Sequence, residues 1–100
     1  MLYRIFTLKT FDEVYEILDG SEQIWIQNIK KQLETHITGK ILHFSWLREK
    51  KYLNKRLYYI VGNEQKKVLM IAFASKKEQQ KIINQILLNK EELLFYLRSL

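Results

Sequence analysis

The feature that most constrains the fold is an almost unbroken apolar run from Val68 to Ala74. A half-buried strand alternates apolar and polar residues, whereas a strand that is apolar at nearly every position is typical of one covered on both faces. We therefore expect this segment to be a central strand of a sheet, with other elements packed above and below it.

Three more segments have the composition of strands. Residues 2–8 are mostly aliphatic and aromatic, and residues 56–61 read Arg-Leu-Tyr-Tyr-Ile-Val. Residues 42–48 alternate, with Leu42, Phe44 and Trp46 expected on one face and His43 on the other. The polar segment 50–54 then predicts a bend between two of these strands.

Capping signals predict the helices. A capping box pairs a small polar residue with a Glu three positions later, and this spacing occurs at Thr10–Glu13, Ser75–Glu78 and Asn89–Glu92. These signals predict a short helix ending near Gly20, a helix through about Leu88, and a helical extension over 89–100 that is either separate or a kinked continuation. Ser21 precedes another stripe at four-residue spacing, which predicts a second helix: Trp25, Ile29 and Leu33.

The predicted order of elements is β-α-α-β-β-β-α. It corresponds to an α+β fold in which a helical hairpin packs on one face of a four-stranded, mostly antiparallel sheet, followed by a helical tail. The 100 residues contain no proline, no repeat and no linker-like stretch, so we expect one domain over residues 1–100.

The composition excludes several classes of protein. Without cysteine the chain has no disulfide and no thiolate metal site, and its two histidines cannot build a histidine-rich one. No apolar run reaches the roughly 18 residues of a membrane-spanning helix, and the first residues lack the long apolar segment of a signal peptide. We expect a cytoplasmic protein that uses neither a metal nor another cofactor.

Positive charge is concentrated in one segment. Residues 48–81 hold ten Lys or Arg against three Asp or Glu, a net of +7, whereas residues 1–47 carry −1 and residues 82–100 are neutral. A field concentrated in this way attracts polyanions such as nucleic acid. The alternative interpretation is an ordinary solvated, lysine-rich surface.

The predicted topology brings three groups of cations to one end of the sheet. If strands 42–48 and 56–61 form a hairpin, the arginines at the end of the first and the start of the second approach each other. Strand 68–74 runs antiparallel to 56–61 and returns to the same end. The groups that should meet there are Arg48 with Lys50 and Lys51, Lys55 with Arg56, and Lys76 with Lys77.

Such a surface has the chemistry to bind RNA and to cleave it without a metal. Arginine stays charged and suits a phosphate whose negative charge grows in the transition state, while crowding of like charges lowers the pKa of a lysine toward that of a base. The ribose 2′-OH would attack the adjacent phosphate and leave a cyclic phosphate and a 5′-OH. Stacking on a base is expected from Tyr52, Tyr58 or Tyr59, of which one or two belong to the core. Further RNA contacts are expected from the free N–H groups of the helix that Ser75 caps, and from Lys55 and Lys81. His43 is an additional candidate for a functional role.

The sequence resembles the RelE/ParE superfamily of toxins, on the RelE/HigB side. The resemblance lies in the order of elements and in three segments: Trp46-Leu47-Arg48, Lys55 to Ile60, and the strand that leads into Ser75-Lys76-Lys77-Glu78-Gln79-Gln80. It implies a type II toxin that cleaves mRNA on the ribosome without a metal and is neutralised by a cognate antitoxin protein. Operator DNA would be contacted only through the antitoxin complex.

The resemblance also implies which residues form the active surface. By position these are Arg48, Lys50 or Lys51, Arg56, and Lys76 or Lys77, with Tyr96 in place of the C-terminal tyrosine or histidine of many relatives. The helical tail from Asn89 would either cover the sheet or be the element that an antitoxin displaces or grips.

Two other functions fit the same sequence. One is a ParE-like toxin that inhibits DNA gyrase by binding and performs no RNA chemistry. The other is a non-catalytic RNA-binding protein, or a degenerate toxin that only holds its antitoxin. The density of cations at 48–56 and the lysine pair favour the ribonuclease, because a gyrase binder has no need for a convergent phosphate site.

Overall fold

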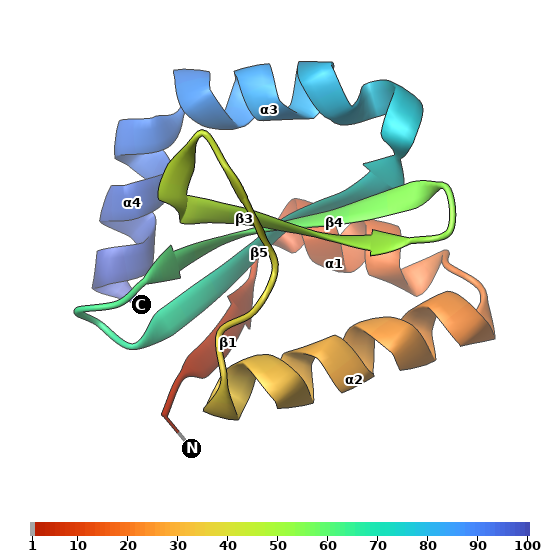
Figure 1. Ribbon diagram of the computed structural model, residues 1–100, viewed down its shortest axis with the longest axis horizontal. Coiled ribbons are helices and arrows are strands. Elements are labelled where there is room, and N and C mark those ends of the chain that lie inside the picture. Colours follow the sequence, from red (N-terminus) through yellow and green to blue (C-terminus); the bar gives the residue numbers. More distant parts are fainter. Residues whose placement is uncertain (1) are drawn as a thin grey trace.

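A five-stranded sheet runs through the middle of the computed structural model, which describes residues 2–100 (Figure 1). Its order is β1-β5-β4-β3-β2, and every neighbouring pair is antiparallel except β1 and β5. The strands are β1 (Arg4–Thr7), β2 (Lys40–Leu42), β3 (Phe44–Tyr52), β4 (Lys55–Gly62) and β5 (Lys67–Ser75).

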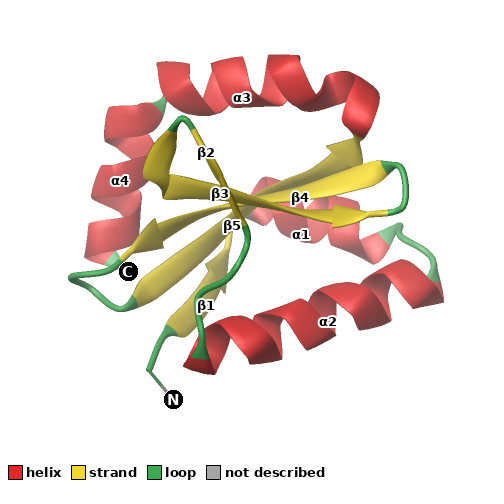
Figure 2. Cartoon of the chain, in the orientation of Figure 1, coloured by secondary structure: helices red, strands yellow, loops and turns green. Residues whose placement is uncertain are grey.

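Helices cover both faces of this sheet (Figure 2). One apolar cluster joins the sheet to α1 (Lys9–Glu16) and α2 (Gly20–Thr35). The other joins it to α3 (Gln79–Leu88) and α4 (Lys90–Ser99), which follow a short 3₁₀ helix, η1 (Lys76–Glu78). The α+β class and the two leading helices are as predicted, and the helical tail forms a second covering layer.

The apolar run is the central strand that the sequence predicts. β5 lies between β1 and β4. Val68 and Met70 are buried in the α1–α2 cluster, and Leu69 between them is buried in the α3–α4 cluster. Consecutive apolar residues are therefore needed because both faces of this strand pack against helices.

The number of strands differs from the prediction because the chain reverses at His43. The expected strand 42–48 is divided there, since His43 adopts a left-handed backbone with φ of 59° and β2 folds back onto β3. β3 then continues to Tyr52, so the expected bend over 50–54 shrinks to a turn at Leu53 and Asn54. The sheet consequently has five strands instead of four.

The helix starts also differ in detail. Asp19 caps α2 instead of Ser21: its Oδ1 accepts from the backbone N–H of Glu22 at 2.8 Å, and the Glu22 carboxylate accepts from the N–H of Asp19 at 3.2 Å. The hydrogen bond from the Glu22 N–H, and after it the one from the Ser21 hydroxyl, lower the pKa of Asp19. The side chains of Ser75 and Asn89 make no cap hydrogen bond, although Asn89 does separate two helices.

The α1 start lacks a polar cap as well. Thr10 lies within the first turn of α1, whose N-cap position is held by Leu8 without a side-chain hydrogen bond. The N–H of Leu8 instead donates to the carbonyl of Met70 at 3.2 Å, which joins the start of the helix to β5. Backbone pairing to the sheet therefore fixes this helix where a capping box was expected.

The C-terminal helix covers the sheet. Leu97 of α4 is 1% exposed and lies in the α3–α4 cluster. The Lys67 ammonium, itself buried, donates to the carbonyl of Arg98 at 3.4 Å and to that of Leu100. A cation at a helix C-terminus satisfies free carbonyls and complements the helix dipole, so Lys67 fixes the end of α4 against β5.

Candidate active site

A polar cluster lies on the face of β3 and β4 that is covered by α3. Residues opposite each other in an antiparallel pair project to the same face, and here Glu49 is opposite Tyr58 while Lys51 is opposite Arg56. Glu49 and Arg56 are diagonal neighbours, roughly 7–8 Å apart at the Cα atoms, which long side chains can bridge. The sheet thus gathers a carboxylate, two cations and a phenol.

Arg56 is a buried cation that has no acidic partner among residues 2–100. It is 7% exposed, and its Nη1 donates to the carbonyls of Leu53 and Lys55 at 3.3 and 3.0 Å. Within residues 2–100, no carboxylate oxygen lies within 4.0 Å of its guanidinium. A guanidinium held by backbone carbonyls at a turn keeps donors for an incoming anion such as a phosphate.

Glu49 is held from the opposite layer. It is 6% exposed, and its Oε2 accepts a hydrogen bond at 2.8 Å from Nε2 of Gln79, the first residue of α3. A buried carboxylate needs such a donor to offset its lost hydration. This contact joins the start of α3 to the β3–β4 hairpin.

Tyr58 has a buried hydroxyl that makes no hydrogen bond of normal geometry within residues 2–100. Burial, and after it the charge of Glu49, raise the pKa of Tyr58 to about 12, against the opposing effects of the Arg56 charge and of the neighbouring Gln79 side chain. The group is consequently a neutral phenol at physiological pH. It can donate a hydrogen bond to an anion that enters the cluster, and it is no base.

The alkaline titration of Tyr58 is expected to show this environment. Phenolate absorbance should show Tyr58 ionising near pH 12, and the Tyr58→Phe variant, which lacks this transition, identifies it. The pKa of Tyr58 should be lower in Glu49→Gln and higher in Arg56→Met. The pKa of Tyr58 in the folded protein exceeds the ordinary 10.0. The contribution of the neutral phenol to the free energy of unfolding is therefore complete below pH 10 and is lost as the pH rises toward 12. Ionisation near 10 in the folded protein would contradict the burial of this group.

Lys76 and Lys77 return to the same end of the sheet as Arg56, as the topology predicts. Arg56 is opposite Ala74, and Lys55 is opposite Ser75. The N–H of Lys76 then donates to the carbonyl of Asn54 at 2.7 Å, which joins η1 to the β3–β4 turn. Both lysines are exposed, and so is Lys81 one turn further along.

The predicted approach of Arg48 to Arg56 is wrong. β3 extends beyond Arg48 to Tyr52, so Arg48 lies opposite Tyr59, three positions from Arg56 and on the other face of the sheet. Its Nε donates to the carbonyl of Ser45 at 3.2 Å. Lys50 shares this α2-covered face, whereas Lys51 shares the face of Arg56, which separates the two neighbouring lysines.

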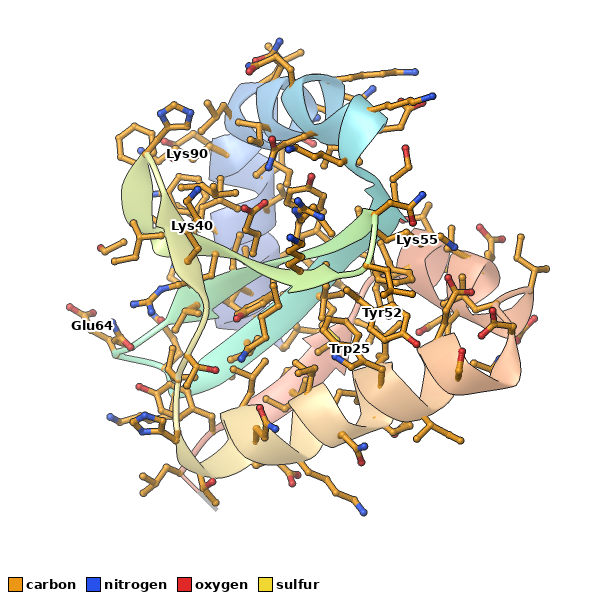
Figure 3. All side chains as sticks on the ribbon, turned by 45° about the vertical axis from the view of Figure 1, so that its right-hand side comes forward. Trp25, Lys40, Tyr52, Lys55, Glu64 and Lys90 are labelled. Carbon is orange, nitrogen blue, oxygen red and sulfur yellow. The ribbon has the colours of Figure 1, made fainter. Side chains whose placement is uncertain are left out.

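Lys55 and Tyr52 fasten the hairpin to α2. Nζ of Lys55 lies 2.5 Å from Oε2 of Glu22 and 5.3 Å from the centre of the Phe73 ring. Tyr52 packs on Trp25 with ring centres 4.9 Å apart, and Figure 3 shows both rings between the hairpin and α2. These contacts give the two residues a structural task in the free protein.

The remaining candidates lie away from the polar cluster. His43 is exposed at the β2–β3 corner, at the opposite end of β3 from the hairpin turn. Tyr96 lines an apolar groove of about 1080 Å³ between α1, β5, α3 and α4. Ser75 pairs with Lys55 in the sheet, and because η1 intervenes before α3, the expected capped helix does not begin at Ser75.

Sequence reasoning missed Glu49, Tyr58 and Gln79. In the sequence, Glu49 is only one of three acidic residues in a basic segment, and Tyr58 has the pattern of a stacking or core residue. The signal that could have identified Glu49 is the period of two from Leu47, which places both side chains on one buried face.

No helix within residues 2–100 is long and apolar enough to cross a membrane.

No protein-family model matches the chain, and no curated protein is significantly similar to it in sequence. The fold, however, is that of the RelE toxins. The structure is similar to the archaeal RelE–RelB complex from Pyrococcus horikoshii OT3, with a TM-score of 0.64 and 16% identity over 76% of this chain and 97% of the matched chain.

Two E. coli structures give the same result. The isolated RelE toxin has a TM-score of 0.59 and 17% identity over 84% of this chain and 98% of RelE. A RelE mutant bound to an antitoxin RelBc peptide has a TM-score of 0.64 and 16% identity over 82% of this chain and 95% of the matched chain. The RelE-like fold expected from the sequence is therefore confirmed.

Proposed function

We propose that this protein is the toxin of a type II toxin–antitoxin system and that it cleaves mRNA on the ribosome. The observation that carries the proposal is Arg56, a buried guanidinium that forms no ion pair within the part of the chain that the structure describes. It lies beside Glu49 and Tyr58 and near the exposed Lys76–Lys77 pair. The RelE-like fold supports the class of toxin. The combination of a phosphate-binding cation with a nearby carboxylate supports RNA cleavage over binding alone.

The reaction that suits these groups is an attack within the RNA strand. Glu49 accepts the proton of a ribose 2′-OH, whose oxygen forms a bond to the adjacent phosphorus. The bond from phosphorus to the 5′ oxygen breaks, and that oxygen takes a proton from a lysine ammonium, for which Lys51, Lys76 and Lys77 are the available donors. The products are a 2′,3′-cyclic phosphate and a 5′-OH.

Arg56 and Tyr58 stabilise charge in this reaction. Negative charge grows on the non-bridging phosphate oxygens in the transition state, and preorganised donors in a water-poor site stabilise it most strongly. The guanidinium supplies a charged donor and the neutral phenol a second one. No step requires a metal ion.

The partner that we propose is a cognate antitoxin protein. RelE is bound to RelB in the archaeal complex and to a RelBc peptide in the E. coli mutant complex. The groove between α1 and α4, which includes Phe95 at 68% exposure and Tyr96 at 43%, offers an apolar surface that a protein partner would cover. Any contact with operator DNA would come through the antitoxin complex.

Controlled expression in bacteria tests the proposed function. We expect wild-type protein to arrest growth and to produce mRNA cuts located at codons, both of which the combined variant Arg56→Ala, Lys76→Ala, Lys77→Ala loses. Lys30→Ala with Lys31→Ala, a neighbouring pair on α2, is the matched control and should behave like wild type. Arrest with intact mRNA and damaged gyrase would support a ParE-like toxin, and no arrest would support a non-catalytic role.

A further inference from the structure

We infer that Gln79 is a positioning residue for the proposed RNA cleavage: it holds the Glu49 carboxylate in the orientation that accepts the 2′-OH proton. The inference rests on the proposed function. The inference gives a role to α3, which contributes no charged group to the reaction proposed above.

The contact between the two residues is specific. Nε2 of Gln79 donates to Oε2 of Glu49 at 2.8 Å, across a separation of 30 positions in the sequence. Holding one carboxylate oxygen fixes the side-chain torsions of Glu49 and leaves Oε1 as the oxygen available for a proton. Orientation of this kind contributes to catalysis because a small misplacement of a base lowers the rate.

Gln79 is itself fixed by its backbone. Ser75 is paired with Lys55, and the N–H of Lys76 donates to the carbonyl of Asn54, so η1 is attached to the β3–β4 turn. Gln79 begins α3 immediately after η1. The donor therefore comes from an element that is hydrogen-bonded to the same hairpin that carries Glu49, which is the arrangement that a precise site requires.

The next residue provides a matched control. Gln80 is also a glutamine in the first turn of α3, but it is exposed, and its Nε2 donates to Asn84 of the same helix at 2.9 Å. Both changes replace a glutamine in the first turn of α3 with leucine. Only the change at Gln79 removes the hydrogen bond to Glu49.

The test is steady-state cleavage of ribosome-bound mRNA by purified Gln79→Leu and Gln80→Leu, each compared with wild type. We expect Gln79→Leu to lower kcat about 10- to 100-fold with little change in KM, because the lost hydrogen bond is to a charged group, and Gln80→Leu to leave both unchanged. In the Glu49→Gln background, Gln79→Leu should have no further effect, since the group that it positions is gone.

Three results would overturn the inference. Equal rates for Gln79→Leu and Gln80→Leu would remove the role of Gln79 while leaving the proposed function intact. A full additional loss in the Glu49→Gln background would show that Gln79 acts independently of Glu49. Wild-type protein that cleaves no ribosome-bound mRNA would refute the proposed function, and the inference with it. Unfolding curves of both variants show whether a lower rate reflects a lower folded fraction.

Discussion

Replacing Arg56 with lysine is expected to lower the rate of mRNA cleavage at least about 100-fold. The change keeps the positive charge but removes the planar fork of donors, and a lysine that donates to both turn carbonyls has only one N–H left, too few for a bidentate contact with a phosphate. Loss of a preorganised charged donor typically costs two to three orders of magnitude in rate. The measurement is single-turnover cleavage of ribosome-bound mRNA by purified protein.

The control for this variant is Arg48→Lys. Both arginines lie on the β3–β4 pair, but Arg48 faces the α2 side of the sheet and contacts the carbonyl of Ser45. We expect Arg48→Lys to retain the rate within a few-fold. If it is as damaging as Arg56→Lys, the RNA-cleaving surface lies on the α2 side and the assignment of the polar cluster is wrong.

Replacing Gly39 with alanine is expected to destabilise the fold by about 2–5 kcal/mol in the free energy of unfolding. Gly39 has φ of +110°, which L side chains rarely adopt. An added Cβ would also overlap the Tyr59 hydroxyl and lie 3.1 Å from the carbonyl of Glu49. Urea unfolding followed by circular dichroism measures the effect.

Gly20→Ala is the control for the Gly39→Ala experiment, and Tyr59→Phe is the background that tests the overlap with the Tyr59 hydroxyl. Nothing lies within 4 Å of a Cβ at Gly20, the first residue of α2, so Gly20→Ala should change stability by at most about 1 kcal/mol. Tyr59→Phe loses the hydrogen bond to the carbonyl of Thr38 at 2.6 Å but also removes the atom that the new methyl group overlaps. Gly39→Ala should thus cost less in the Tyr59→Phe background, and strict additivity would contradict this clash.

Patterns that depend on burial could be predicted from the sequence. The apolar run of β5 indicates that both faces of this strand are buried. The four-residue spacing of Ile29 and Leu33 indicates the buried stripe of α2, where both side chains are at most 5% exposed. The return of Lys76 toward Arg56 followed from antiparallel order alone. Each of these predictions depends only on the periodicity of neighbouring residues or on the order of adjacent strands.

Features that depend on a single torsion or on register could not be predicted. The left-handed backbone at His43 has no strong signal in a residue other than glycine, yet it creates β2. The length of β3 decided whether Arg48 or Lys51 would be opposite Arg56. The bond from Gln79 to Glu49 joins elements 30 positions apart, and no local pattern indicates it.

The most direct test of the proposed attack by the ribose 2′-OH is the chemistry of the cut ends. Purified wild-type protein is mixed with ribosomes carrying a defined mRNA, and with the same mRNA containing a 2′-deoxy nucleotide on the 5′ side of the mapped cut. We predict a 2′,3′-cyclic phosphate and a 5′-OH from the natural strand, and no cleavage at the deoxy position. Cleavage of the deoxy strand at that position, or products with a 5′-phosphate, would contradict the proposed attack by the 2′-OH.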